Sequence, residues 1–181
     1  GGLTARQFLS EYWQKKPLLV RNAVPGFSGL LSRDELFAAA RRDDVESRLI
    51  VRPMSRESGL WDLRRGPFAA RDLKPRPHPW TVLVQGLNLI LPGAEALMGR
   101  FDFIPHARLD DVMVSWASDG GGVGPHFDSY DVFLLQGLGQ RHWRIGANKD
   151  KTLVDGLPIR ILKHFKPSKE WVLNPGDLLY L

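Results

Sequence analysis

The chain has 181 residues, of which 43% are hydrophobic and 25% are charged, a composition typical of folded globular proteins and not of disordered ones. It contains no cysteine, which excludes disulfides, thiolate zinc sites and a cysteine nucleophile, and which fits a reducing cytoplasm. No apolar run approaches the roughly 20 residues of a membrane-spanning helix, and none follows a basic start as in a signal peptide.

The formal charge is +5, which indicates an anionic partner such as RNA or a ribonucleoprotein surface, or else a solvated surface rich in arginine. Both ends suggest a piece of a longer protein. The chain begins with Gly1 and Gly2 instead of methionine, and it ends on "NPGDLLYL", an apolar alternation with no turn after it.

The first segment predicts two helices with a strand between them. Thr4 followed by Gln7, and Ser32 followed by Glu35, are capping-box patterns that start helices. The first helix has apolar residues at helical spacing and stops at Pro17, and the second continues through "LFAAARR". The stretch "PLLVRNA" between them predicts a short strand.

From Ser47 onward the pattern changes to short apolar runs separated by Gly, Pro, Asn and Asp, interrupted by a predicted helix over 94–101. The predicted strands lie in "SRLIVRP", "LWDLRR", "WTVLVQGL", "DVMVSWAS", "YDVFLLQGL", "QRHWRIG", "IRILKHF", "EWVLNP" and "DLLYL". We therefore expect a mainly β fold, a sandwich or small barrel, with helices at the N-terminus. The predicted division is a helical segment over 1–46 and a barrel over 47–181.

The stretch "DGGGVGPHFDSYDVF" combines a glycine run with a His-x-Asp pair. On a strand, His126 and Asp128 would point to the same face and offer a nitrogen and an oxygen ligand to one metal ion. This is part of the two-histidine-one-carboxylate set of iron(II) enzymes. The alternative is a surface histidine beside an ordinary aspartate. The glycines would leave space for substrate and dioxygen, and a phosphate loop is disfavoured because no helix follows them.

Arg141 follows a predicted apolar strand and a Gly-x-Gly turn. It lies at alternate positions with Trp143 and Ile145 on the next predicted strand. If that face points inward, the guanidinium needs an anionic partner, because burying an unpaired charge is costly. A dicarboxylate cosubstrate would supply one through bidentate pairing. The alternatives are an outward-facing arginine or one that pairs with a protein carboxylate.

The run "DDVMVSWASDGGGVGPHFDSYDVFLLQGLGQRHWRIG" resembles the ribosomal oxygenases of the JmjC/cupin family, which are iron(II)- and 2-oxoglutarate-dependent protein hydroxylases. The likeness extends to "EYWQKKPLLVRNA", "VESRLI", "WTVLVQGLN" and "WVLNPGDLLYL", so it covers nearly the whole chain. The resemblance implies a double-stranded β-helix, also called a jelly roll, with N-terminal helices.

The resemblance also implies residue roles. His126 and Asp128 match two iron ligands, and Arg141 matches the residue that binds the distal carboxylate of 2-oxoglutarate. The family's third ligand is a histidine shortly after the strand that matches "GDLLYL", so we expect this chain to hold two of the three protein ligands, with metal bound weakly or not at all. The other histidines are predicted to be structural or exposed: His78, His106, His142 and His164.

The activity implied by the resemblance is hydroxylation of an arginine in a large-subunit ribosomal protein, with dioxygen as second cosubstrate and a homodimeric full-length enzyme. Asp119 is then a candidate to bind the substrate guanidinium, or a turn residue that caps "DGGG". Ser115 is a candidate contact to 2-oxoglutarate, or a core residue. The alternatives are a histidine hydroxylase or lysine demethylase, a non-catalytic cupin that binds RNA, and a small-molecule cupin enzyme that does not need Arg141.

Overall fold

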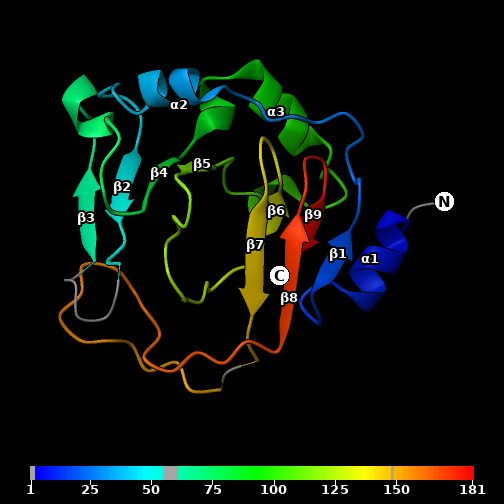
Figure 1. Cartoon of the computed structure of the whole chain (residues 1–181). Helices are drawn as coiled ribbons and strands as arrows, with labels where there is room; N and C mark the ends of the chain where they lie inside the picture. Colours follow the sequence, from blue (N-terminus) through cyan, green and yellow to red (C-terminus); the bar gives the residue numbers. More distant parts are fainter. Residues whose placement is uncertain (1–2, 55–60, 148) are drawn as a thin grey trace. The chain divides into compact units, whose positions relative to one another are not determined.

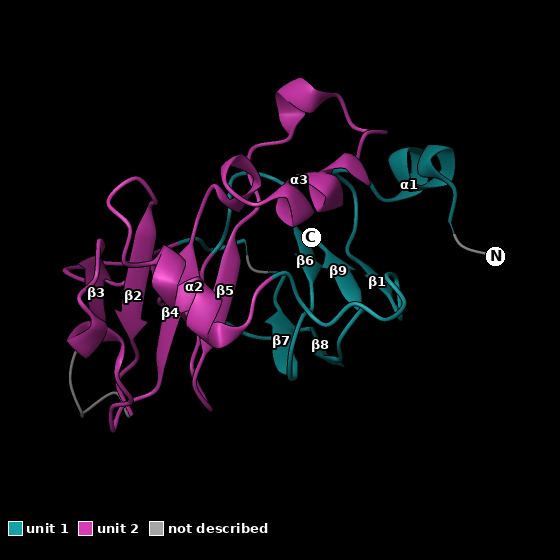
Figure 2. Ribbon diagram, turned by 90° about the horizontal axis from the view of Figure 1, so that it is seen from above, with its two compact units in different colours: residues 1–30, 127–151, 164–181 teal, residues 31–126, 152–163 magenta. Residues whose placement is uncertain are grey.

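The structure is a computed structural model that describes residues 3–54, 61–147 and 149–181. Its ribbon is shown in Figure 1. The chain forms two compact units, coloured separately in Figure 2. The first unit comprises residues 1–30, 127–151 and 164–181, and the second comprises residues 31–126 and 152–163. The division predicted from the sequence, 1–46 and 47–181, stays a prediction.

The first unit holds the helix α1 and strands from both ends of the chain. Its elements are α1 (Ala5–Glu11), β1 (Leu18–Val20), β6 (Phe133–Leu135), β7 (Arg141–Ile145), β8 (Lys169–Leu173) and β9 (Leu178–Tyr180). One antiparallel sheet has the order β1-β9-β6, and β7 pairs with β8 in a separate antiparallel ladder. The predicted capping box of Thr4 and Gln7 starts α1, which ends several residues before Pro17.

The core of the first unit is an aromatic cluster between α1 and the sheet β1-β9-β6. Phe8 of α1 lies 4.8 Å, centroid to centroid, from the ring of Tyr180, which in turn lies 5.1 Å from Phe133. Trp13 stacks on both Phe133 and Tyr180. Phe8 and Tyr180 are almost completely buried, so this cluster anchors the N-terminal helix to β9.

The second unit contains the remaining helices and a larger sheet. Its elements are α2 (Arg33–Ala39), β2 (Ser47–Val51), β3 (Asp62–Arg65), η1 (Ala70–Leu73), β4 (Trp80–Val84), η2 (Leu87–Leu89), α3 (Pro92–Gly99), η3 (His106–Arg108) and β5 (Val114–Ala117). The sheet is antiparallel with the order β3-β2-β4-β5. Every residue of β4 is buried, as expected for an apolar central strand.

Helix α2 covers one face of this sheet. Phe37 lies 5.7 Å from the ring of Trp80 and 5.3 Å from that of Trp116. Because residues directly opposite each other in a ladder share a face, Ser115, which is paired with Leu83, points to the other face. The sequence pattern therefore decides which side chains of β4 and β5 pack against α2 and which do not.

The predicted fold class is confirmed: the chain is mainly β with antiparallel sheets and a few helices. One predicted strand is wrong. The stretch "IRILKHF" forms no strand, and its only sheet-like contact among the described residues is an isolated bridge between Leu153 and Leu162. Across the described ranges, no helix has the length and apolar character that crossing a membrane requires.

Candidate functional site

The His-x-Asp pair lies in an irregular segment between β5 and β6, where residues 118–132 form no strand. The strand on which the expectation for His126 and Asp128 rested is therefore not formed, and their binding of one metal ion stays a prediction. The glycines and Pro125 explain why no strand forms, because a run of Gly and Pro residues does not sustain a strand. The chain passes from the second unit to the first between these two residues, so the structure describes each residue in its own unit.

The segment before His126 is held closely by the second unit. Arg52 donates to the Gly120 carbonyl at 3.0 Å, and the Leu162 amide donates to the Pro125 carbonyl at 2.8 Å. Gly124 has a left-handed φ of +75°, and a Cβ there would meet Ile161 at 2.5 Å. Only glycine suits this position. Gly122 is different, since no heavy atom lies within 4 Å of its hypothetical Cβ.

The ring of His126 is oriented by the backbone. Its Nδ1 lies 2.9 Å from the carbonyl oxygen of Gly124. Because a carbonyl only accepts, Nδ1 must carry the hydrogen, and the neutral ring then has its lone pair on Nε2. This is the arrangement in which a histidine binds a metal through Nε2 while a carbonyl fixes its tautomer.

Asp128 lies on the wall of a cavity of about 440 Å³ in the first unit. The cavity is also lined by the turn after α1, by Asp131 and by the end of β9. Lys15 and Lys16 face the same cavity as the two aspartates, so its wall carries charges of both signs.

Arg141 is the first residue of β7, and it lies opposite Leu173 of β8. Along β7, Arg141, Trp143 and Ile145 are half-buried, whereas His142 and Arg144 are exposed, so the predicted alternation is confirmed. Burial lowers the pKa of Arg141. No hydrogen bond or ion pair joins its side chain to another residue in the described part of the chain. The alternatives of an outward-facing arginine and a protein-paired arginine are therefore not observed.

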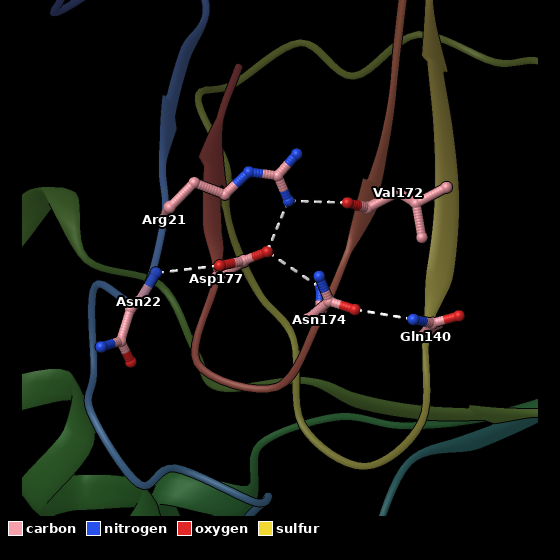
Figure 3. Close-up of polar contacts among 6 residues, drawn as sticks. All are labelled: Arg21, Asn22, Gln140, Val172, Asn174 and Asp177. Atoms are coloured by element: carbon pink, nitrogen blue, oxygen red, sulfur yellow. Dashed lines mark hydrogen bonds and ion pairs between the residues drawn. The ribbon is translucent and has the colours of Figure 1, made fainter.

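A buried carboxylate, Asp177, lies near the end of the β7–β8 ladder at which Arg141 is paired (Figure 3). Asp177 is 4% exposed and accepts hydrogen bonds from the backbone amides of Asn174 and Asn22 at 2.9 and 2.8 Å and from Arg21 Nη1 at 2.6 Å. These contacts, with that of Asn174 the largest, hold its pKa below the usual range. Gln140, next to Arg141, donates to the Asn174 side chain at 2.7 Å.

The second unit holds the other predicted site residues. Ser115 is half-buried on β5, on the face of the sheet that α2 does not cover. Asp119 is exposed in the turn after β5, and its carboxylate makes no hydrogen bond or ion pair with another described residue. The cap that the sequence offered as an alternative for Asp119 is therefore not formed.

The structure thus describes Asp128 and Arg141 in one unit and His126, Ser115 and Asp119 in the other. No group of three or more His, Asp or Glu side chains that could hold a metal ion is present among the described residues. Sequence reasoning missed the Asp177 cluster. Its signal was available, because an aspartate between a Pro-Gly turn and an apolar strand commonly bonds to turn amides.

The fold and these residues define a β protein whose sequence is similar to oxygenases. Residues 96–181 match the family model of the JmjC domain. Over 99% of this chain, the sequence is 39% identical to the probable ribosomal oxygenase of Haemophilus influenzae. It is 37% identical over 96% of the chain to the ribosomal protein uL16 3-hydroxylase of Escherichia coli.

A solved structure agrees with these matches. The Escherichia coli ribosomal oxygenase YcfD in complex with cobalt and 2-oxoglutarate has a TM-score of 0.84 and 36% identity over 99% of this chain. The chain spans about half the length of these relatives: 44% and 46% of the two curated proteins and 45% of the solved one. The chain is therefore similar to the ribosomal oxygenases in sequence and in fold, and its residues 96–181 match the JmjC domain.

Proposed function

We propose that the protein is an iron(II)- and 2-oxoglutarate-dependent hydroxylase that acts on an arginine of a large-subunit ribosomal protein. The observation that carries the proposal is Arg141, a half-buried guanidinium with no anionic partner among the described residues. Such a charge needs an anion from a ligand, and 2-oxoglutarate has a free carboxylate at its far end. The solved relative with bound 2-oxoglutarate supports this choice of anion.

His126 and Asp128 are the residues that would hold the metal. They fit iron(II), because an imidazole with its lone pair on Nε2 and a carboxylate are two of the three ligand types of this class. Two Cα–Cα steps of about 3.8 Å keep them within about 7.6 Å along the chain. When bound, iron(II) with 2-oxoglutarate supplies the chemistry that inserts one oxygen atom of dioxygen into a C–H bond, with formation of succinate and carbon dioxide.

The chain's own residues then bind and orient. Arg141 would bind the distal carboxylate of 2-oxoglutarate through two parallel N–H donors, and the Ser115 hydroxyl would donate to the cosubstrate. Asp119 is exposed and without a protein partner in the described chain, so it can pair with a substrate guanidinium. Gly122, with open space around it, leaves room for a substrate side chain.

The experiment is a hydroxylation assay on the full-length natural protein with iron(II), 2-oxoglutarate and isolated large-subunit ribosomal proteins. We expect a mass gain of one oxygen atom on one arginine, located by fragmentation, and its loss in the His126→Ala variant. A folded protein that gives no mass gain would contradict the proposal. Oxygen on a histidine, or loss of a methyl group from a lysine, would keep the reaction class and overturn the arginine substrate.

The charge distribution supports contact with ribosomal RNA, which would place the protein in the cytoplasm. Residues 147–169, which are the connection after β7 and the first residue of β8, hold six Lys or Arg and two Asp, a net +4 of the total +5. All six cations are exposed: Lys149, Lys151, Arg160, Lys163, Lys166 and Lys169. We expect Lys149→Glu with Lys151→Glu to weaken binding to ribosomal RNA and to lower the salt dependence of that binding. Unchanged affinity would contradict RNA contact.

The family resemblance also leads us to infer that the full-length protein is a homodimer. Sedimentation equilibrium of that protein tests this, since a monomer at all accessible concentrations would contradict it.

A further inference from the structure

A closed ring of hydrogen bonds in the first unit joins Gln14, Asp131 and Tyr180. The Tyr180 hydroxyl donates to Asp131 Oδ1 at 2.8 Å, and Gln14 Nε2 donates to Asp131 Oδ2 at 3.3 Å. The backbone N–H of Gln14 donates to the Tyr180 hydroxyl oxygen at 2.8 Å. We call these three residues the Gln14–Asp131–Tyr180 ring. It links the turn after α1, the strand β9 and the segment that precedes β6.

The ring is built on rigid parts of the unit. Tyr180 is 1% exposed and belongs to the aromatic cluster that anchors α1. Burial, with Asp131 adding to it, raises the pKa of Tyr180 to about 12, so the hydroxyl keeps its proton and remains a donor. Gln14 has a left-handed φ of +56°, which is unfavourable for a residue other than glycine. The two hydrogen bonds that Gln14 makes within the ring offset the free-energy cost of this backbone conformation.

The ring lies beside the proposed metal ligand. Its three residues and Asp128 line the same cavity of about 440 Å³. Asp131 follows Asp128 by three residues, which limits their Cα separation to about 11 Å. Directly after Asp131, Val132 exchanges two backbone hydrogen bonds with Leu181, each 3.1 Å, which continue the ladder of β6 and β9.

Asp131 is therefore the last residue of the segment 128–131 before the sheet begins. The ladder already joins β6 to β9, and the aromatic cluster already joins α1 to the sheet. The ring additionally fixes the orientation of Asp131, at the C-terminal end of the segment 128–131 that carries Asp128.

We propose that the Gln14–Asp131–Tyr180 ring is a positioning device that holds the 128–131 segment in the conformation in which Asp128 binds the metal ion. This inference rests on the proposed function, and it assigns to these residues a role in metal affinity. The ring touches neither metal nor substrate, so its members are positioning residues. A partner that orients a metal ligand typically changes metal affinity by about 10- to 100-fold when it is removed.

The test uses cobalt(II) with the full-length natural protein. Tyr180→Phe removes only the hydroxyl, and we expect about tenfold weaker cobalt binding by calorimetry together with a changed visible absorption of the bound cobalt. Asp131→Asn keeps an acceptor oxygen for Tyr180, so a smaller loss is expected than for Asp131→Ala. The control is Ser47→Ala, which removes a buried hydrogen bond of 3.0 Å to the Ala40 carbonyl in the second unit. It should lower Tm and leave cobalt affinity and spectrum unchanged.

The outcomes separate the two proposals. If Tyr180→Phe and Asp131→Ala lower Tm as Ser47→Ala does but bind cobalt with native affinity and spectrum, the ring is structural and the inference is overturned. The proposed function would still stand in that case, provided that His126→Ala loses cobalt. If the native protein binds no more cobalt than the His126→Ala variant, the metal site and the role of the ring fail together.

Discussion

Two charged side chains of the first unit, Asp177 and Arg141, have opposite surroundings. Asp177 is buried, and it accepts hydrogen bonds from the Asn174 and Asn22 amides and from Arg21, which lower the pKa of its carboxyl group. Arg141 is half-buried, and none of the described residues offers it an acceptor, so burial lowers the pKa of its guanidinium. One charge is stabilised by the protein itself, and the other is destabilised by it.

The difference separates a charge that stabilises the fold from one for which we propose a role in ligand binding. A carboxylate that is satisfied within the protein contributes to folding, and removing it leaves donors without a partner. A cation without an internal partner opposes folding and gains its partner when an anionic ligand binds. The two residues are linked, because Gln140 joins the Asn174 end of the Asp177 cluster to the start of β7. The cluster thus contacts the residue that precedes the strand carrying Arg141.

The largest effect is expected from Arg141→Met in the full-length protein. It removes the proposed partner of the 2-oxoglutarate carboxylate, and we expect about 100-fold weaker cosubstrate affinity by calorimetry in the presence of cobalt. The ligand-free protein should lose no stability and should gain up to about 1 kcal/mol, because an unpaired half-buried charge is removed. Arg144→Met, on the exposed side of the same strand, is the control and should bind 2-oxoglutarate normally. Equal 2-oxoglutarate affinities of the two variants would contradict the proposal that Arg141 binds the cosubstrate carboxylate.

Unlike Arg141→Met, Asp177→Ala should lower the stability of the folded protein. The amides of Asn22 and Asn174 and the Arg21 guanidinium lose their acceptor, and we expect the free energy of unfolding to fall by about 2 kcal/mol in urea titrations. Asp34→Ala, at an exposed ion pair, is the control and should change stability by less than about 0.5 kcal/mol. A loss for Asp177→Ala no larger than that of the control would show that the cluster is not structural.

The contribution of Asp177 should also depend on pH. Its pKa is lowered in the folded protein, so its stabilisation is fully present above the pKa of the unfolded chain, about 3.9, and is lost as the pH falls through the lower folded value. The stability difference between the native protein and Asp177→Asn should therefore be largest at neutral pH and shrink in acid. Urea titrations across this range measure it, and a difference that stays constant contradicts the account.

The smallest effect is expected for Gln140→Ala, which removes the hydrogen bond between Asn174, near Asp177, and the residue that precedes β7. Its hydrogen bond to Asn174 is exposed, so the free energy of unfolding should fall by no more than about 1 kcal/mol. If the cluster positions Arg141 through this link, 2-oxoglutarate affinity should fall about threefold as well, which corresponds to under 1 kcal/mol. Affinity that stays native would show that β7 is positioned by its ladder with β8 alone.

Much of the local structure could be predicted, because interactions between residues close in the sequence determine it. The capping boxes at Thr4 and Ser32 start the helices α1 and α2, and the alternation of Arg141, Trp143 and Ile145 is the one observed in β7. A prediction from local pattern fails where a strand needs a partner that is distant in the sequence. The stretch "IRILKHF" has the composition of a strand, but within the described chain it finds no sheet partner beyond one bridge.

By itself, the sequence determined the mainly β class and the helix starts, because these follow from periodicity and capping, whereas the family resemblance predicted the residue types of an iron and 2-oxoglutarate site. Only the tertiary structure decided which charges have partners. It showed that His126 and Asp128 lie in an irregular segment, that Gly124 is required by contact with Ile161, and that Asp131 bonds to Gln14 and Tyr180. Gln14 and Tyr180 are 166 residues apart, and no local pattern records contacts over such a separation.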